Sequence, residues 1–280
     1  MRCVLASFLL ALLALPANAH ENAWSFTVTP YAWLMGASGS TTAKGQAIDV
    51  NADVVDMFGK TDTLVPLMAS IEARHDKLSF GLDFIFTQMG ATPAFATQRN
   101  PTPWLSFAAA AGASVKSTMA MVEGSGTYEM FRPTEKTAVD ALLGVRHWHT
   151  ATDANLGFTA TGTIGFPWDA RWPQSGGFAV ASTGNMDGAD PVFGLVLRHE
   201  IVPRHRPRLR GDIGGFGVGS QLTWQAFGGY SYAFSSGPTS WSAVLDSRAI
   251  GLNYSAGTGF DYRALNLVLH GPLLGLSLKS

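Results

Sequence analysis

Hydrophobic and polar residues alternate with a period of two along several stretches of the chain. In residues 78–87 the even positions hold Leu or Phe, while the odd positions hold Ser, Gly, Asp, Ile and Thr. Residues 139–146 and 221–234 repeat the pattern. Such alternation indicates strands whose two faces meet different surroundings. The alternating runs extend over about 10–14 residues, which is longer than typical globular strands and close to what a tilted membrane strand needs.

Turn signals divide the chain into short and long connections. Short breaks fall at 75–77, 132–135, 203–206 and 235–238, and long irregular stretches cover 37–62, 91–112 and 150–188. Outer-membrane barrels place short turns in the periplasm and long loops outside. Ten strands are predicted on this basis: 24–36, 64–76, 78–90, 112–131, 137–149, 189–202, 206–216, 220–235, 240–254 and 260–278.

Two alternatives concern the loops. The count rises to twelve if residues 155–166 form another hairpin arm. Within the first loop, residues 51–59 predict a short helix with Asn51 as N-cap and Gly59 as terminator.

The first nineteen residues have the features of a secretory signal peptide. Met1-Arg2 precedes an apolar run over residues 3–15, and Pro16-Ala17-Asn18-Ala19 supplies a small-x-small cleavage site before His20. Cleavage removes Cys3, the one cysteine of the chain, so no disulfide framework is expected. Residues 1–19 are thus predicted to be cleaved, and residues 20–280 to form a single barrel domain.

The chain is charge-poor without being disordered. Of the 280 residues of the full sequence 46% are hydrophobic and 14% are charged, and the formal net charge is −1, so nucleic-acid binding is not expected. After residue 20 no window of about 18 apolar residues occurs, which excludes helical spans. A closed barrel is the other structure that satisfies every backbone group in lipid. The predicted fold class is therefore all-β, a closed antiparallel transmembrane β-barrel.

The polar faces of the predicted strands carry acids and arginines in balance. In a barrel of about ten strands the interior is narrow, so charges there must pair, and arginine can bind carboxylates bidentately. We predict an ion-pair network that fills the lumen and leaves at most a narrow pore. Its expected members are Glu72, Arg74, Asp83, Asp140, Arg146, Asp190, Arg198, Arg208, Arg210, Asp212, Asp246, Arg248, Asp261 and Arg263. Pairs two residues apart are Glu72/Arg74, Asp246/Arg248 and Asp261/Arg263.

Aromatic residues recur near the ends of the predicted strands, where membrane barrels carry interfacial girdles. The predicted girdle consists of Trp24, Tyr31, Trp33, Trp148, Trp224, Tyr232, Trp241, Tyr254 and Tyr262. The last predicted strand fits less well, because Leu265, Leu267, Leu269 and Leu273 fall on the face assigned to the interior; a bulge could change the register there.

Several segments of the chain resemble a known family. They are residues 29–36, 139–146, 190–194, 211–220 and 271–276, and they are similar to signatures of a largely uncharacterised family of Gram-negative outer-membrane β-barrel proteins. The resemblance implies an outer-membrane location, reached by signal-peptide-dependent secretion, and implies no enzyme activity. It also implies contact with outer-membrane lipid, including lipopolysaccharide, and with the assembly machinery. The C-terminus departs from the pattern, since it ends in Leu278-Lys279-Ser280 rather than in an aromatic residue.

Catalytic chemistry is not predicted. His147, His149, Asp153 and Ser182 could meet near the outer rim, but G-x-S-x-G and H-E-x-x-H motifs do not occur. No cofactor and no metal are expected. Residues 198–210 form a local basic patch that could bind lipid phosphates or form a solvated periplasmic turn.

Three functions follow from the sequence: a structural or surface-interaction barrel, a passive small-solute channel, or a soluble periplasmic all-β ligand-binding protein. The first is the one that the sequence favours, and neither a ligand nor a transported solute is named by it.

Overall fold

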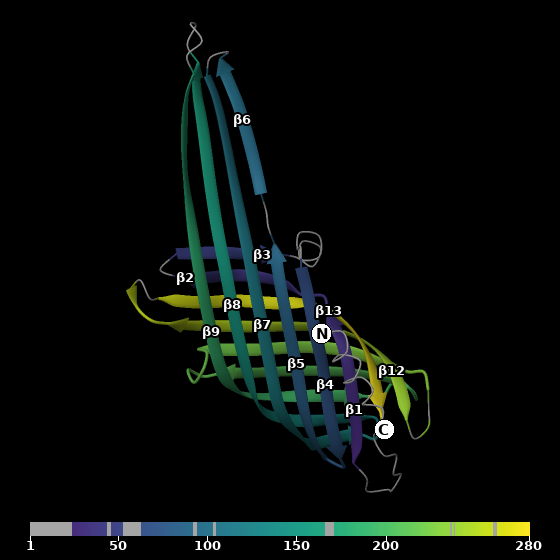
Figure 1. Ribbon diagram of the computed structural model, residues 1–280. Coiled ribbons are helices and arrows are strands. Elements are labelled where there is room, and N and C mark those ends of the chain that lie inside the picture. The colour runs from purple at the N-terminus through teal and green to yellow at the C-terminus, as the bar shows by residue number, and fades with distance from the viewer. Residues whose placement is uncertain are drawn as a thin grey trace.

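The computed structural model of this protein is built almost wholly from antiparallel strands (Figure 1). It describes residues 24–43, 46–52, 63–91, 94–102, 105–165, 171–235, 237, 239–259 and 262–280. The strands are β1 (Ser25–Trp33), β2 (Gly36–Ala43), β3 (Gln46–Ala52), β4 (Thr63–His75), β5 (Leu78–Ala91), β6 (Ala94–Thr102), β7 (Leu105–Thr134), β8 (Thr137–Gly165), β9 (Arg171–His199), β10 (His205–Gly215), β11 (Leu222–Ala233), β12 (Ser240–Ala256) and β13 (Arg263–Lys279). The predicted signal peptide lies outside the described residues.

Ten of the strands close into a barrel. Their order is β1-β4-β5-β7-β8-β9-β10-β11-β12-β13, and β13 pairs back with β1 through Thr27↔Lys279 and Trp33↔Leu273. Each corresponds to one of the ten predicted strands, so the predicted fold and strand number are confirmed. Residues 155–165 belong to β8 and add no strand to the ring, which rules out the twelve-stranded alternative.

Several long connections are strands rather than irregular loops, contrary to expectation. β7, β8 and β9 contain 30, 29 and 29 residues and continue beyond the barrel, where β6 pairs with β7 (Figure 1). These extensions are rich in Ala, Gly and Thr, so their sequence lacks the alternation that revealed the barrel strands. The backbone pairing of β7 with β8 and of β8 with β9 nevertheless continues from the barrel into these extensions.

The first loop is also partly a hairpin. β13 pairs with β1 near its end and with β2 near its start, and β3 pairs with β2. Asn51, predicted to cap a helix, lies in β3 opposite Ser38. The prediction is therefore wrong at its first residue, and residues 53–59 lie outside the described part of the chain.

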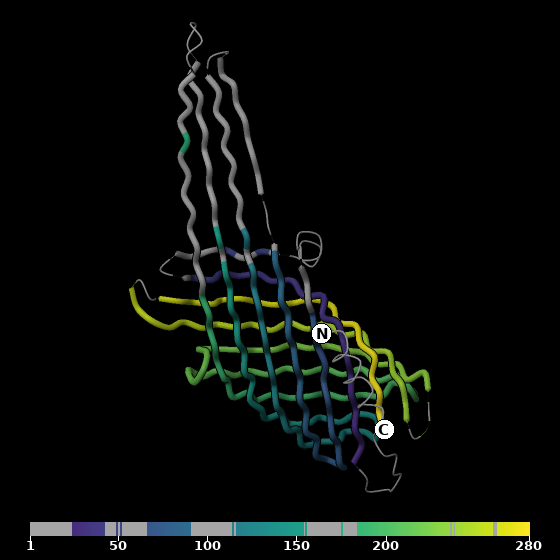
Figure 2. Tube along the Cα trace, viewed as in Figure 1, coloured from purple at the N-terminus to yellow at the C-terminus, as the bar shows by residue number. Residues whose placement is uncertain are grey.

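The barrel has a short-turn end and a long-hairpin end. Turns near residues 76, 135 and 202 lie at the first end. The start of β1 and the end of β13 lie at the same end (Figure 2). The connections through β2–β3, β6 and the tips of β8–β9 lie at the other end (Figure 1). Within the described residues no helix has the length and apolar character required to span a membrane.

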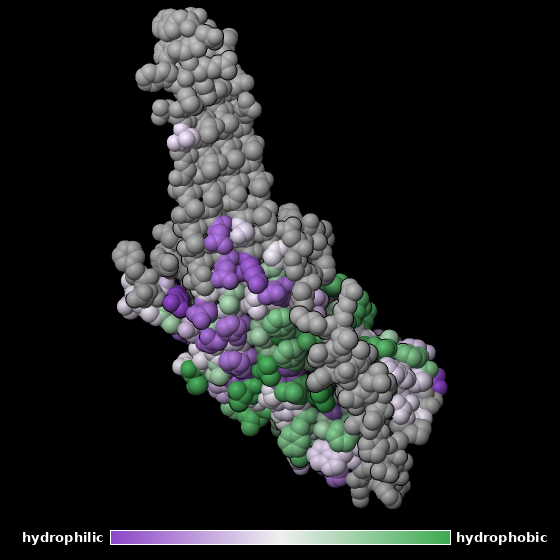
Figure 3. All heavy atoms as spheres, in the orientation of Figure 1, coloured by the Kyte–Doolittle hydropathy of each residue, from purple (hydrophilic) through white to green (hydrophobic). Residues whose placement is uncertain are grey.

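The outer face of the barrel is apolar. Leu143, Phe80, Leu209 and Leu245 are 58%, 52%, 55% and 57% exposed. Their strand neighbours Ser79, Asp246 and Arg146 are buried on the inner face. Apolar residues gather over the lower part of β4, β5 and β7 in Figure 3, with polar residues above them. This is the reverse of a soluble sheet, in which apolar side chains are buried and charged ones are solvated.

One half of the barrel interior is filled by apolar side chains, which we call the apolar plug. Its buried members are Trp33, Met35, Met68, Ile85, Met119, Met121, Trp148, Ile250, Leu252, Leu265, Leu269 and Leu273. The leucines of β13 thus face inward and belong to the plug, so no change of register is needed to explain them.

Trp148 is the fully buried centre of the plug, and its register partner Gly188 leaves room for the indole. A Cβ at Gly188 would lie 2.5 Å from the indole ring, so only glycine fits beside this tryptophan. Tyr254 packs edge-on against the other side, with ring centroids 5.2 Å apart. The indole therefore fills the part of the lumen between β9 and β12.

Candidate functional site

Below the apolar plug the lumen holds a layer of ion pairs centred on Arg146. This guanidinium is 0% exposed, and its Nη2 donates to Glu123 Oε2 and to Asp212 Oδ1, both at 2.7 Å. Arg210 completes the group, because its Nη2 lies 2.5 Å from Glu123 and its Nε 2.7 Å from Asp212. Two arginines and two carboxylates thus satisfy one another, as buried charges require.

A second group joins walls that lie far apart around the ring. Arg248 on β12 donates through Nη2 to Asp83 on β5 at 2.7 Å, and through Nη1 to the Tyr31 hydroxyl at 3.1 Å. Tyr31 in turn donates to Asp83 at 2.7 Å. The guanidinium also lies 5.6–5.8 Å from the rings of Tyr31, Trp33 and Phe227. Bonds and ring contacts therefore cross the lumen at this level.

A third group lies nearer the short-turn end. Asp140 accepts from Arg198 Nε at 2.7 Å and from Arg74 Nη2 at 3.2 Å. Arg74 also reaches Glu72 at 3.1 Å, and Glu129 accepts from Arg198 at 3.1 Å. Asp140 is thus shared between arginines of β4 and β9, and Arg198 joins two carboxylates of β7 and β8.

Asp190 holds the connection between β10 and β11. Its Oδ1 accepts the Ser220 amide at 2.6 Å, and its Oδ2 accepts the Ser220 hydroxyl at 2.7 Å and the Trp148 indole N–H at 3.0 Å. All three residues are fully buried. The carboxylate therefore links the loop at the long-hairpin end to the apolar plug.

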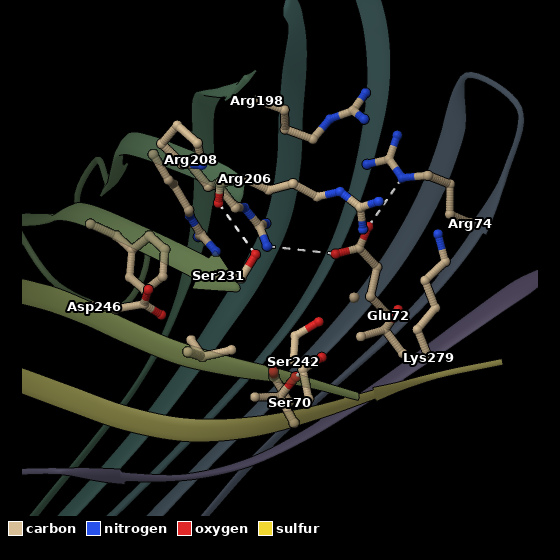
Figure 4. Close-up of a pocket in the computed structure, with 18 of the residues that line it drawn as sticks. Ser70, Glu72, Arg74, Arg198, Arg206, Arg208, Ser231, Ser242, Asp246 and Lys279 are labelled. Atoms are coloured by element: carbon tan, nitrogen blue, oxygen red, sulfur yellow. Dashed lines mark hydrogen bonds and ion pairs between the residues drawn. The ribbon is translucent and has the colours of Figure 1, made fainter. Parts of the chain in front are cut away.

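At the short-turn end the lumen opens into a cavity of about 460 Å³, which we call the vestibule. Side chains of the turns line its mouth, among them Glu135, Lys136 and Glu200, while Arg248 and Leu273 lie at its inner end. Figure 4 shows Arg74, Arg198, Arg206, Arg208 and Lys279 gathered around the Glu72 carboxylate. The vestibule is thus the polar, accessible part of the barrel interior.

Most of the residues predicted for the ion-pair network line the lumen in the structure. The three groups together contain Glu72, Arg74, Asp83, Asp140, Arg146, Arg198, Arg210, Asp212 and Arg248, and Arg208 faces Glu72 at 3.6 Å.

Three predicted members stand apart. Asp190 accepts neutral donors, and Asp246 accepts the Tyr230 amide at 3.1 Å instead of pairing with Arg248. The Arg263 prediction is wrong, because this side chain is exposed and donates to the Asn185 carbonyl at 3.2 Å. Asp261 lies outside the described residues.

Sequence reasoning missed two central acids, Glu123 and Glu129. Both lie on β7. The available signal was a row of residues two apart, Glu123, Ser125, Thr127 and Glu129, which shares the inner face with Met119 and Met121. Methionines pointing into the lumen obscured this polar row.

The predicted aromatic girdle is wrong at four positions. Tyr31, Trp33, Trp148 and Tyr254 point into the lumen, where they contact Arg248 or the apolar plug. Trp24, Tyr232 and Tyr262 are exposed, at 43%, 39% and 38%. Trp224 and Trp241 lie on the outward faces of β11 and β12. Inward-facing aromatics were misread because position near a strand end does not reveal which face a ring occupies.

The histidines at the outer rim make one close contact. His149 Nδ1 lies 2.5 Å from Asp187 Oδ1, and both side chains are partly exposed on neighbouring strands. Asp153 is exposed further along β8, whereas the Ser182 side chain is not described. Among the described residues no group of three His, Cys, Asp or Glu is suited to a metal ion.

Comparison with known proteins gives matches only among solved structures. No family model and no curated protein matches the chain. Outer membrane protease OmpT from Escherichia coli is 8% identical, over 94% of this chain and 99% of that one, with a TM-score of 0.45. A Pseudomonas aeruginosa FadL homologue is 8% identical over 92% and 90%, with a TM-score of 0.30. The translocator domain of autotransporter NalP from Neisseria meningitidis is 8% identical over 99% and 95%, with a TM-score of 0.29. Likenesses at this level do not bear on what the chain does.

Proposed function

We propose that this protein is an integral outer-membrane β-barrel whose lumen is closed to solutes, with a structural or surface-interaction role. The observation that carries the proposal is the inverted distribution of side chains. Leu143, Leu209 and Leu245 are exposed outward while Arg146 and Asp140 are buried. A protein surrounded by water would leave a continuous apolar belt exposed, which is rare in soluble monomers. In a membrane, hydrocarbon chains around the barrel would cover this belt, so its apolar side chains would not be exposed to water.

The orientation follows from the two unlike ends. Short turns such as Asp76-Lys77 would face the periplasm, together with the chain termini. The sheet formed by β6 and the extensions of β7, β8 and β9 would then stand outside the cell (Figure 1). Lipopolysaccharide would surround the barrel at this end, and the projecting sheet would be the part that external partners meet. Delivery would need secretion and the outer-membrane assembly machinery.

Contacts across the lumen support a closed barrel. Arg248 on β12 and Asp83 on β5 join strands across the lumen, and the apolar plug fills the half nearer the outside. Side chains of a ten-stranded barrel come close to filling its interior. These contacts disfavour the passive-channel alternative, because a permeating solute would have to displace both the plug and the ion pairs.

Membrane fractionation tests the location. We expect the protein in the outer-membrane fraction after a urea wash, with a gel mobility that changes on heating because the barrel unfolds only then. A monomer that is soluble without detergent would overturn the proposal and favour the periplasmic ligand-binding alternative. Uptake of arabinose into proteoliposomes then tests closure, and swelling at the rate of an open porin would favour the channel.

A further inference from the structure

The vestibule has a wall chemistry suited to anions. Among its lining residues nine are Lys or Arg and six are Asp or Glu. The deepest of the cations, such as Arg210 and Arg248, are held by carboxylates at 2.5–2.7 Å. Three carboxylates just behind the wall, Glu129, Asp140 and Asp212, also bind lining arginines and offset the difference in number. The cations that are weakly paired are those nearer the mouth.

Three of these cations are weakly engaged. Arg208 Nη1 lies 3.6 Å from Glu72, and its buried Nε has no hydrogen-bond acceptor among the described residues. Arg206 Nε lies 3.7 Å from the exposed Glu200 carboxylate. Lys279 has no carboxylate within ion-pair distance in the described part of the chain, although it is close enough to interact electrostatically with Arg206 and Glu72. Strong charge-assisted hydrogen bonds are shorter than these contacts, at about 2.7–2.9 Å.

Glu72 shows where an anion would sit. Its carboxylate already pairs with Arg74 at 3.1 Å, and it cannot also satisfy Arg206, Arg208 and Lys279, which surround it in Figure 4. The unsatisfied donors come from β10 and β13, on opposite sides of the Glu72 side chain (Figure 4). A second anionic group beside Glu72 would complete the charge balance.

We propose that the vestibule binds the phosphate group of a small soluble anion through Arg206, Arg208 and Lys279. A phosphate group carries a charge of about −1.5 to −2 and three strong acceptor oxygens, which matches three donors better than a single carboxylate does. A cavity of about 460 Å³ is in the size range of small-molecule sites. It opens between the turns at the short-turn end, so the ligand enters from the aqueous phase rather than sideways from lipid.

Calorimetric titration of the folded full-length protein in detergent, with inorganic pyrophosphate at low salt, tests this site. We expect saturable binding that weakens at least about tenfold in the R208Q/K279Q variant, because charge-assisted hydrogen bonds are lost. The matched control is K77Q/R204Q, which removes two exposed cations at the same end that do not line the vestibule. Glu72→Gln should tighten binding, because it removes the built-in competing carboxylate.

The opposite results overturn the site. They are absence of binding to the unmodified protein, an equal loss in the K77Q/R204Q control, or weaker binding in the E72Q variant. A parallel titration with phosphatidylglycerol bicelles distinguishes the source, and binding to the lipid alone would contradict a soluble ligand. Because binding is measured in detergent, its outcome is independent of membrane insertion and of conductance.

Discussion

The guanidinium of Arg248 and the carboxylate of Asp83 meet at 2.7 Å, although 165 residues separate them along the chain. Arg248 is on β12 and Asp83 on β5, so the pair ties together walls that are not neighbours in the ring. A contact of this kind stabilises the closed barrel, because it joins two walls, and it also occupies the lumen between them. The two charges depend on each other, because both side chains are largely buried.

Arg248→Met should destabilise the barrel by about 3–5 kcal/mol, since Asp83 would keep its charge inside the lumen without its cation. The double variant R248M/D83N should lose less than the sum of the two single variants. Urea unfolding in detergent, followed by tryptophan fluorescence, measures both. Arg263→Met removes an exposed arginine and provides the control; additive single effects would show that the pair is not coupled.

Trp148→Ala should cost about 3–5 kcal/mol, because it leaves a cavity in the apolar plug and removes a donor from Asp190. Trp224→Ala is the matched control. The Trp224 indole lies over Gly251 on the outer face, so its removal leaves no cavity in the lumen. The temperature at which gel mobility changes on heating compares the two. Equal loss in both variants would contradict an interior role for Trp148.

Leu143→Arg tests which solvent the outer face meets. Leu143 lies on the outward face of the barrel part of β8, where an arginine in the middle of the hydrocarbon costs about 2–4 kcal/mol. Asn253→Arg near the long-hairpin end should cost about 0–1 kcal/mol, as expected close to an interface. Unfolding in lipid vesicles measures the difference. An arginine tolerated equally well at both positions would indicate that water surrounds the barrel.

Cysteines placed at Lys116 and Lys136 test the orientation. Both side chains are exposed, Lys116 on β7 beyond the barrel and Lys136 in the turn between β7 and β8. An impermeant maleimide should label the first on intact cells and the second only after the outer membrane is permeabilised. The reverse pattern would invert the proposed topology. Cys3 would be removed with the signal peptide, so background labelling should be low.

The sequence predicts the barrel well because one physical pattern repeats in several strands. Alternation of the kind seen along β5 and β8 assigns the two faces of a strand. Together with the positions of the short turns, it is sufficient to count ten strands. It could not predict the extensions of β7, β8 and β9, whose Ala, Gly and Thr residues have no two-faced pattern.

Most members of the candidate site and the Glu72–Arg74 pair were predictable, but Glu123, Glu129 and the partners across the lumen were not. Alternation places Arg248 on the inner face, yet its bond to Asp83 depends on how the barrel closes, and the expected partner two residues away points elsewhere. Trp148 was assigned to the membrane interface because its place near a strand end does not reveal that Gly188 makes room for it inside. Pairing across a lumen is a property of the closed ring, not of any one strand.

Single-channel recording in planar lipid bilayers tests the closed lumen most directly. At neutral pH the account predicts no steady conductance above the bare bilayer, because the plug around Trp148 and the Arg248–Asp83 pair span the interior. A large, stable open state in the unmodified protein would contradict it.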